Sequence, residues 1–111
     1  MAGMAQSTDV IQGTLDLLIL RSLSLQPMHG FGVTQRIEQI SEGVFKVNPG
    51  SLLVAFQRLE REGLIDAEWR ASENNRRARY YKLTRAGQRR LKHETDNWQR
   101  RAAAVARLLE T

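Results

Sequence analysis

The chain contains no cysteine, only two prolines and few aromatic residues. The absence of cysteine excludes disulfide bonds, zinc fingers and thiol catalysis. The longest apolar run, residues 17–20, lies between Asp16 and Arg21 and is far too short to span a bilayer. The first nine residues lack the basic segment and the apolar run of a signal peptide. We therefore expect a cytoplasmic protein without a membrane partner.

Catalytic and metal-binding patterns are missing as well. The two histidines, His29 and His93, lie far apart in the sequence and have no carboxylates at metal-binding spacing, so we predict no metal site and no cofactor. The sequence has no recognisable nucleophile–base pair, and the short motif of residues 30–32 is better interpreted as a loop-to-helix turn than as a phosphate loop. We predict that the protein is not an enzyme and that His29 braces this turn.

Charge is distributed unevenly along the 111 residues, which are enough for one domain with a modest core. Residues 1–45 contain two basic and four acidic side chains, whereas residues 46–111 contain 15 basic and eight acidic ones. A basic half beside a near-neutral half is typical of a polyanion-binding face. An arginine-rich surface that serves solubility alone would give the same totals.

Hydrophobic spacing predicts two helices in the first third of the chain, over residues 10–25 and 30–41. Thr8 or Asp9 is expected to cap the first. That helix is apolar nearly all round, so it needs cover on both sides. A second subunit can supply this cover, or the helix can be the central one of a single chain.

A third helix is predicted over residues 49–62, with Asn48 or Ser51 as its cap and Gly63 at its end. Leu53 and Val54 lie off its buried stripe, which is unusual for a surface helix. They can either contact thymine methyl groups in a major groove or extend the core. The buried stripe itself is formed by Leu52, Ala55, Phe56 and Leu59.

Alternation then predicts a strand over residues 64–69, a polar loop over 70–77 and a return strand over 78–83. Arg76, Arg77 and Arg79 give this hairpin a basic tip. Arginine presents a planar, permanently charged fork that suits phosphates and narrow grooves. Arg79 can instead pair with Asp66 or Glu68 across the hairpin.

The last predicted helix extends to about residue 109, with Thr84 as its cap. Apolar and small residues recur there at heptad spacing, as in a short coiled-coil seam. We interpret the helix as a dimerisation arm that packs on its mate and on the first helix of the other subunit; the alternative is an intramolecular lid. The predicted dimer interface consists of Leu15, Leu18, Leu91, Thr95, Trp98, Ala102, Val105 and Leu109.

These elements predict an α+β, mainly α fold: a winged helix-turn-helix with a C-terminal dimerisation helix. We divide the chain into a flexible N-terminus (residues 1–8), a winged helix-turn-helix DNA-binding domain (9–83) and the dimerisation helix (84–111).

Four blocks together, in this order and spacing, resemble the PadR family of bacterial winged-helix transcriptional regulators, in particular its short subfamily with a single C-terminal helix. They are Pro27-Met28-His29-Gly30-Phe31-Gly32-Val33, Asn48-Pro49-Gly50-Ser51-Leu52, Arg58-Leu59-Glu60-Arg61-Glu62-Gly63-Leu64-Ile65 and Arg76-Arg77-Ala78-Arg79-Tyr80-Tyr81-Lys82-Leu83-Thr84-Arg85-Ala86-Gly87. The resemblance implies a homodimer that represses transcription by occluding its operator, with the third helix in the major groove and the wings in adjacent minor grooves.

The chain departs from this family at Leu53 and Val54, where a Tyr followed by a Pro is usual and the Tyr contacts DNA. Phe56 also replaces a usual Leu. Trp98 is similar to a Trp of multidrug-responsive members, in which two symmetry-related indoles sandwich flat aromatic ligands. The resemblance thus implies a small aromatic effector at Trp98; the alternative is a core anchor of the dimer interface.

We predict that the protein binds double-stranded operator DNA. Ser51 would lie at the start of the recognition helix and Gln57 at a base edge, while Lys46, Asn48 and Arg58 would position phosphates. The alternative function is a winged-helix protein-interaction module with weak or lost DNA binding. The predicted DNA-binding residues are Gln35, Lys46, Asn48, Ser51, Leu53, Val54, Gln57, Arg58, Arg76, Arg77 and Arg79.

Overall fold

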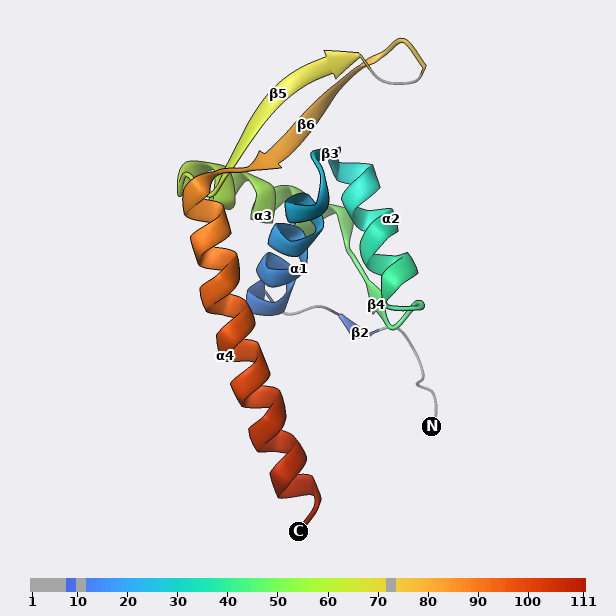
Figure 1. The fold of residues 1–111 in the computed structure, drawn as a ribbon. Coiled ribbons are helices and arrows are strands. Elements are labelled where there is room, and N and C mark those ends of the chain that lie inside the picture. The colour runs from blue at the N-terminus through green and yellow to red at the C-terminus, as the bar shows by residue number, and fades with distance from the viewer. Residues whose placement is uncertain (1–7, 10–11, 72–73) are drawn as a thin grey trace.

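The computed structural model describes residues 8–9, 12–71 and 74–111. Its four helices are α1 (Gln12–Leu25), α2 (Gly30–Ile40), α3 (Pro49–Arg61) and α4 (Arg85–Leu109). Its strands are β2 (Thr8–Asp9), β3 (Met28–His29), β4 (Phe45–Lys46), β5 (Ile65–Ala71) and β6 (Arg77–Leu83). Figure 1 shows the β5–β6 hairpin above the helices and α4 running down one side. The predicted fold class, a mainly helical winged helix-turn-helix with a long C-terminal helix, is confirmed.

Helix α1 occupies the centre of the domain and contacts α2, α3, α4 and β6 (Figure 1). Ile19 and Leu20 are completely buried, and Leu15 is only 3% exposed. The chain's own elements therefore cover most of this helix, as the central-helix alternative expects. An all-round apolar pattern arises here because four neighbours pack on one short helix.

Three strands form an antiparallel sheet in the order β3-β6-β5, with Tyr81 of β6 opposite both Met28 and Ala67. The hairpin of β5 and β6 is longer than predicted, because Arg70 and Ala71 still pair with β6. Arg70 lies over the ring of Tyr80, 5.1 Å from its centroid, and this cross-strand contact supports pairing beyond the core.

The short strands β2, β3 and β4 have no counterpart in the sequence prediction, because two residues show no periodicity. Thr8 or Asp9 was expected to cap α1, but both lie in β2, where Thr8 pairs with Phe45 of β4. Helix α1 is described from Gln12, and its predicted start at residues 10–11 lies outside the described residues. Of the predicted flexible N-terminus, residues 1–7 lie outside them too.

The predicted caps of α3 and α4 are present. The side chain of Asn48 accepts hydrogen bonds from the backbone N–H groups of Gly50 and Ser51 at the start of α3. Gly63 follows that helix with a φ of 76°, which favours glycine. At the start of α4, the hydroxyl of Thr84 accepts from the N–H of Gly87 and donates to the carbonyl of Gly63.

Helix α4 packs on α1 and β6 near its start and then projects beyond the domain (Figure 1). Gly87 is buried in the packed part, beneath the backbone of Leu64 and the side chain of Leu83. Within the described residues, no helix combines the length and the apolar character that a bilayer-crossing segment needs.

Candidate nucleic-acid interface

The outward face of α3 carries apolar side chains in its first half. The opposite face anchors the helix in the core through its buried stripe, so the outward side chains have a fixed direction. Leu53 is 54% exposed and Val54 is 63% exposed, which excludes the alternative that they extend the core. Gln57 is exposed one turn further along the helix, where it can reach a base edge as predicted. Ser51 is exposed at the first turn.

Arg58 faces α1 rather than the outward side of α3. Its Nη2 atom lies 2.6 Å from Oδ1 of Asp16, and its Nη1 atom lies 3.7 Å from Oε2 of Glu62. The hydrogen bond with Asp16 is the largest cause of the raised pKa of Arg58. We therefore reassign Arg58 from a phosphate contact to an ion pair that ties α3 to α1.

Arg61 replaces it as the basic side chain on the outward face. It is exposed and lines a shallow hollow together with Gln57 and Glu60. Arg61 was not among the DNA-binding residues predicted from the sequence. The signal was available, because Arg61 follows Gln57 at i+4 and Val54 at i+7, which places all three on one helical stripe.

The wing carries a basic and aromatic cluster on the face that continues from α3. The guanidinium carbons of Arg77 and Arg79 lie 5.4 Å and 5.8 Å from the ring centroid of Trp69, which is 54% exposed. Nη2 of Arg79 also lies 2.8 Å from Oε2 of Glu60 on α3. Trp69 lies on the same face of β5 as the buried Ile65, but it is exposed because the hairpin extends past the core at this position.

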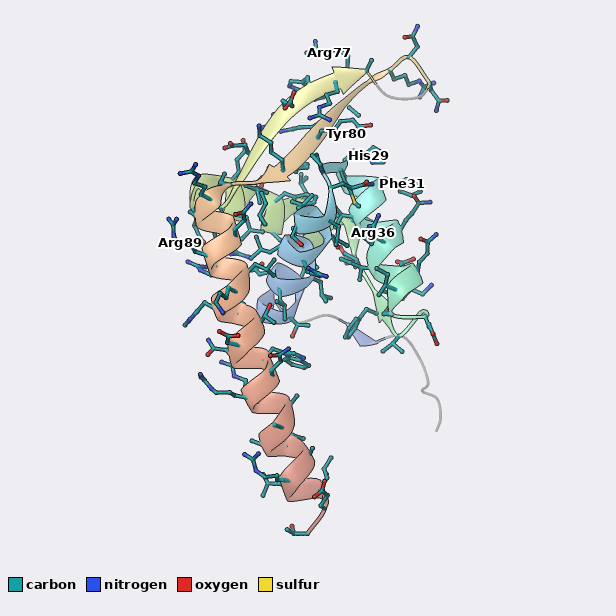
Figure 2. All side chains as sticks on the ribbon, viewed as in Figure 1. His29, Phe31, Arg36, Arg77, Tyr80 and Arg89 are labelled. Atoms are coloured by element: carbon teal, nitrogen blue, oxygen red, sulfur yellow. The ribbon has the colours of Figure 1, made fainter. Side chains whose placement is uncertain are left out.

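The two cross-hairpin partners predicted for Arg79 are therefore wrong. Asp66 and Glu68 alternate with Trp69 along β5 and project from the other face of the sheet. Glu68 pairs with Arg70, whose Nη2 donates a hydrogen bond of 3.4 Å to Oε1 of Glu68, and this hydrogen bond lowers the pKa of Glu68. Arg76 and Arg77 are exposed at the tip, and Figure 2 shows Arg77 near the upper end of the wing.

His29 joins the wing to α2. Its Nδ1 accepts a hydrogen bond of 3.0 Å from the N–H of Gly32, which caps α2 and confirms the predicted bracing role. Its ring meets Tyr80 edge-on at a centroid distance of 5.4 Å. Phe31, next to it in Figure 2, is 67% exposed. It borders an apolar hollow of about 600 Å³ between α2, α3 and β6, which Leu53 also lines.

Three other residues that were predicted to bind DNA either lie away from this cluster or make a structural hydrogen bond instead. Gln35 is exposed on α2 and lines a polar hollow beside Arg36 to which α3 does not contribute. Lys46 is exposed in β4, at the end of α2 opposite the wing (Figure 1). Asn48 uses its side-chain oxygen to cap α3.

The predicted dimer interface, which draws residues from α1 and α4, divides into two parts. Leu91 and Leu18 pack partly buried against the core. Trp98 is 48% exposed, and Val105 and Leu109 further along are more exposed still. Thr95 is partly buried and Ala102 is exposed. Because Leu15 is enclosed in the core of a single chain, we no longer place it at a subunit interface. Figure 2 shows Arg89 on the side of α4 away from α1.

Known proteins resemble this chain over most of its length. A family model described as the transcriptional regulator PadR-like family matches residues 19–93, from α1 through the wing and into α4. An uncharacterized protein X of Lysinibacillus sphaericus is 29% identical over 91 residues, which cover 82% of this chain and 84% of that protein.

Solved structures show the same similarity. A PadR family transcriptional regulator from Eggerthella lenta is 28% identical with a TM-score of 0.74, over 90% of this chain and 85% of that one. A transcriptional regulator from Clostridium thermocellum is 25% identical with a TM-score of 0.79, over 87% of this chain and 94% of that one. These similarities extend over nearly the whole chain rather than over one motif.

Proposed function

Because the chain belongs to the PadR-like family of transcriptional regulators, it is a DNA-binding regulator and not an enzyme, and we propose that it acts as a homodimeric repressor that occludes its operator. The observation that carries the DNA-binding geometry is the link between α3 and the wing through Glu60 and Arg79. This link presents the outward face of α3 and the wing arginines as one surface. Helix α3 would enter the major groove and the wing would follow the adjacent backbone.

The proposed division of labour follows from side-chain chemistry. Arg76 and Arg77 at the tip would contact phosphates or the minor groove, which gives affinity and orientation without reading sequence. Ser51, Gln57 and Arg61 on α3 would approach base edges or the phosphates that border the major groove.

The experiment that tests this function removes the two tip charges. In the Arg76→Ala, Arg77→Ala double variant, affinity should fall for all duplexes, and the dependence of log K on log salt should flatten by about two. A matched control, Arg85→Ala with Arg89→Ala, removes the same charge from exposed positions of α4. A salt slope that is unchanged in the tip variant would show that the wing tip does not contact DNA.

Dimerisation is supported by the part of α4 that the single chain leaves uncovered. Trp98, Val105 and Leu109 recur on one side of the projecting segment and are largely exposed. A second α4 would bury them in a coiled-coil-like contact. Val105→Glu with Leu109→Glu should convert the dimer to a monomer in sedimentation experiments. A wild-type chain that sediments as a monomer at micromolar concentration would contradict this arrangement.

The exposed indole of Trp98 supports a response to a planar aromatic effector. Two Trp98 side chains would face each other across a dimer and could hold a flat ring between them, or they could serve only as core anchors. A planar dye should quench Trp98 fluorescence in a Trp69→Phe background, which removes the other indole. Undiminished dye binding in Trp98→Ala would place the ligand site elsewhere.

The alternative function, a protein-interaction module with weak or lost DNA binding, is favoured by one observation. Leu53 and Val54 are exposed apolar residues, and such residues commonly mark protein contacts. The basic wing argues against it. A gel shift with the upstream region of the protein's own gene separates the two functions.

A further inference from the structure

The outward surface around the start of α3 contains an apolar patch, which we define as Phe31, Leu53 and Val54. Each of the three side chains is more than half exposed. Phe31 and Leu53 line one apolar hollow, whose walls include Pro49 and Leu52. Val54 adjoins Leu53 on the same helix. Clustered apolar side chains on a surface need an occupant, because their exposure to water is unfavourable.

The surroundings of the patch favour a polyanion as that occupant. Arg61 lies further along the same outward stripe of α3, and Arg79 lines the hollow from the wing side. Glu60, the carboxylate next to Arg61, is paired with Arg79, so these two charges largely offset each other. A patch bordered by Arg61 and continuous with the basic wing tip fits DNA better than a neutral protein surface.

Double-stranded DNA offers a major-groove reader few apolar groups. The 5-methyl group of thymine is the apolar group on a base edge, and it distinguishes T from C and from uracil. A leucine and a valine at the start of a recognition helix are suited to this group and cannot donate hydrogen bonds to phosphates. This inference rests on the proposed function. We infer that Leu53 and Val54 read thymine methyl groups, while Phe31 shields the adjoining hollow from water.

The consequence is a preference for A·T pairs opposite the first half of α3. Gln57 follows on the same stripe, and a glutamine can pair with an adenine edge. The operator half-site would therefore contain thymines whose methyl groups, and not only their hydrogen-bonding atoms, contribute to affinity.

The experiment first selects binding sequences for the full-length protein from duplexes with a randomised central segment. Each thymine of a selected duplex is then replaced by deoxyuridine, which removes only the methyl group. Affinity is measured by the fluorescence anisotropy of a labelled duplex. One or two positions should lose about fourfold in affinity per methyl group.

Variants then connect those positions to the patch. Val54→Ser removes both methyl groups of the side chain, and Leu53→Asn keeps the branched shape of leucine but replaces its methyl groups with an amide. In each, the ratio of thymine to uracil affinity should approach one at its own position. Val44→Ser is the matched control, because Val44 is an exposed valine in the turn between α2 and β4, outside the patch. It should keep the wild-type ratio.

The outcomes distinguish this inference from the proposed function. Selective DNA binding with no uracil effect at any position overturns the methyl-reading inference and leaves the regulator intact. A uracil effect that persists unchanged in both patch variants overturns it as well. Failure to select any duplex overturns the proposed function itself and favours a protein occupant for the patch.

Discussion

The guanidinium of Arg79 on β6 lies 2.8 Å from the carboxylate of Glu60 on α3. This ion pair joins the wing to the helix with the candidate base-reading face. The same guanidinium lies over the ring of Trp69, so a single arginine is held by contacts from two elements. Both charged side chains are more than one third exposed, so the pair contributes less than about 1 kcal/mol to stability. Its main consequence is the orientation of the wing.

Replacing Glu60 with glutamine should therefore change DNA binding more than folding. The substitution removes one negative charge from the candidate interface, while the amide oxygen of glutamine can still accept a hydrogen bond from Arg79 and keep the wing in place. Affinity for any duplex should rise, and the dependence on log salt should steepen by about one. Anisotropy titrations at several salt concentrations measure both. Glu94→Gln on α4 is the control, and an equal change there would indicate a general effect of net charge.

Trp69 should act by positioning the wing arginines. Trp69→Ala removes the ring that faces Arg77 and Arg79 and should cost about threefold in affinity, from a cation–π contribution of about 0.5–1 kcal/mol. The salt slope should stay unchanged, because no charge is lost. Trp69→Phe keeps an aromatic face and should restore most of the affinity. Equal losses in the two variants would show that the ring face is not what matters.

Gly87 should be intolerant of any side chain. A Cβ atom there would collide with the carbonyl oxygen of Leu64 and with the side chain of Leu83. Gly87→Ala should destabilise the fold by about 1–3 kcal/mol, because α4 must shift away from the wing base. Urea unfolding measures this loss.

Gly13→Ala is the matched control, because an added Cβ at this position of α1 meets no atom of the described residues within 4 Å. This variant should be as stable as wild type or more stable by less than about 1 kcal/mol, as alanine favours a helix over glycine. A Gly87→Ala protein as stable as wild type would mean that α4 packs less closely than the structure shows.

Tyr81 should make the fold sensitive to alkaline pH. Burial raises the pKa of Tyr81, whose ring stacks on Phe56 at a centroid distance of 4.2 Å. The unfolded chain releases this proton near pH ~10, whereas the folded chain retains it. The associated stability is thus fully present below about pH 10 and is lost as pH rises through the folded pKa. In Tyr81→Phe, the free energy of unfolding should fall less steeply with pH across this range. Denaturant titrations at a series of fixed pH values measure it. Parallel plots of unfolding free energy against pH for the two proteins would contradict this.

Local chemistry made much of the fold predictable. Asn48, Gly63 and Thr84 act within a few residues of their own position, so their capping and terminating roles could be inferred from spacing alone. The alternation of β5 and β6 likewise identified the hairpin. The two-residue strands were missed, since their pairing depends on Phe45 and Tyr81 from distant parts of the chain.

The candidate site was less predictable, because the direction of a long side chain depends on its neighbours. Sequence spacing placed Arg58 and Arg61 equally off the buried stripe of α3. Only the packing of α3 against α1 brings Asp16 within 2.6 Å of Arg58 and leaves Arg61 outward.

By itself, the sequence determined the helices, the wing with its arginines and the family to which they belong, because these depend on periodicity and on short motifs. The tertiary structure decided which charges remain available for DNA. Asp16 and Glu60 each pair with an arginine from another element, and such contacts arise only when distant segments pack together. It also decided that Leu53 and Val54 face outward, because the buried stripe on the opposite face of α3 anchors the helix on the core.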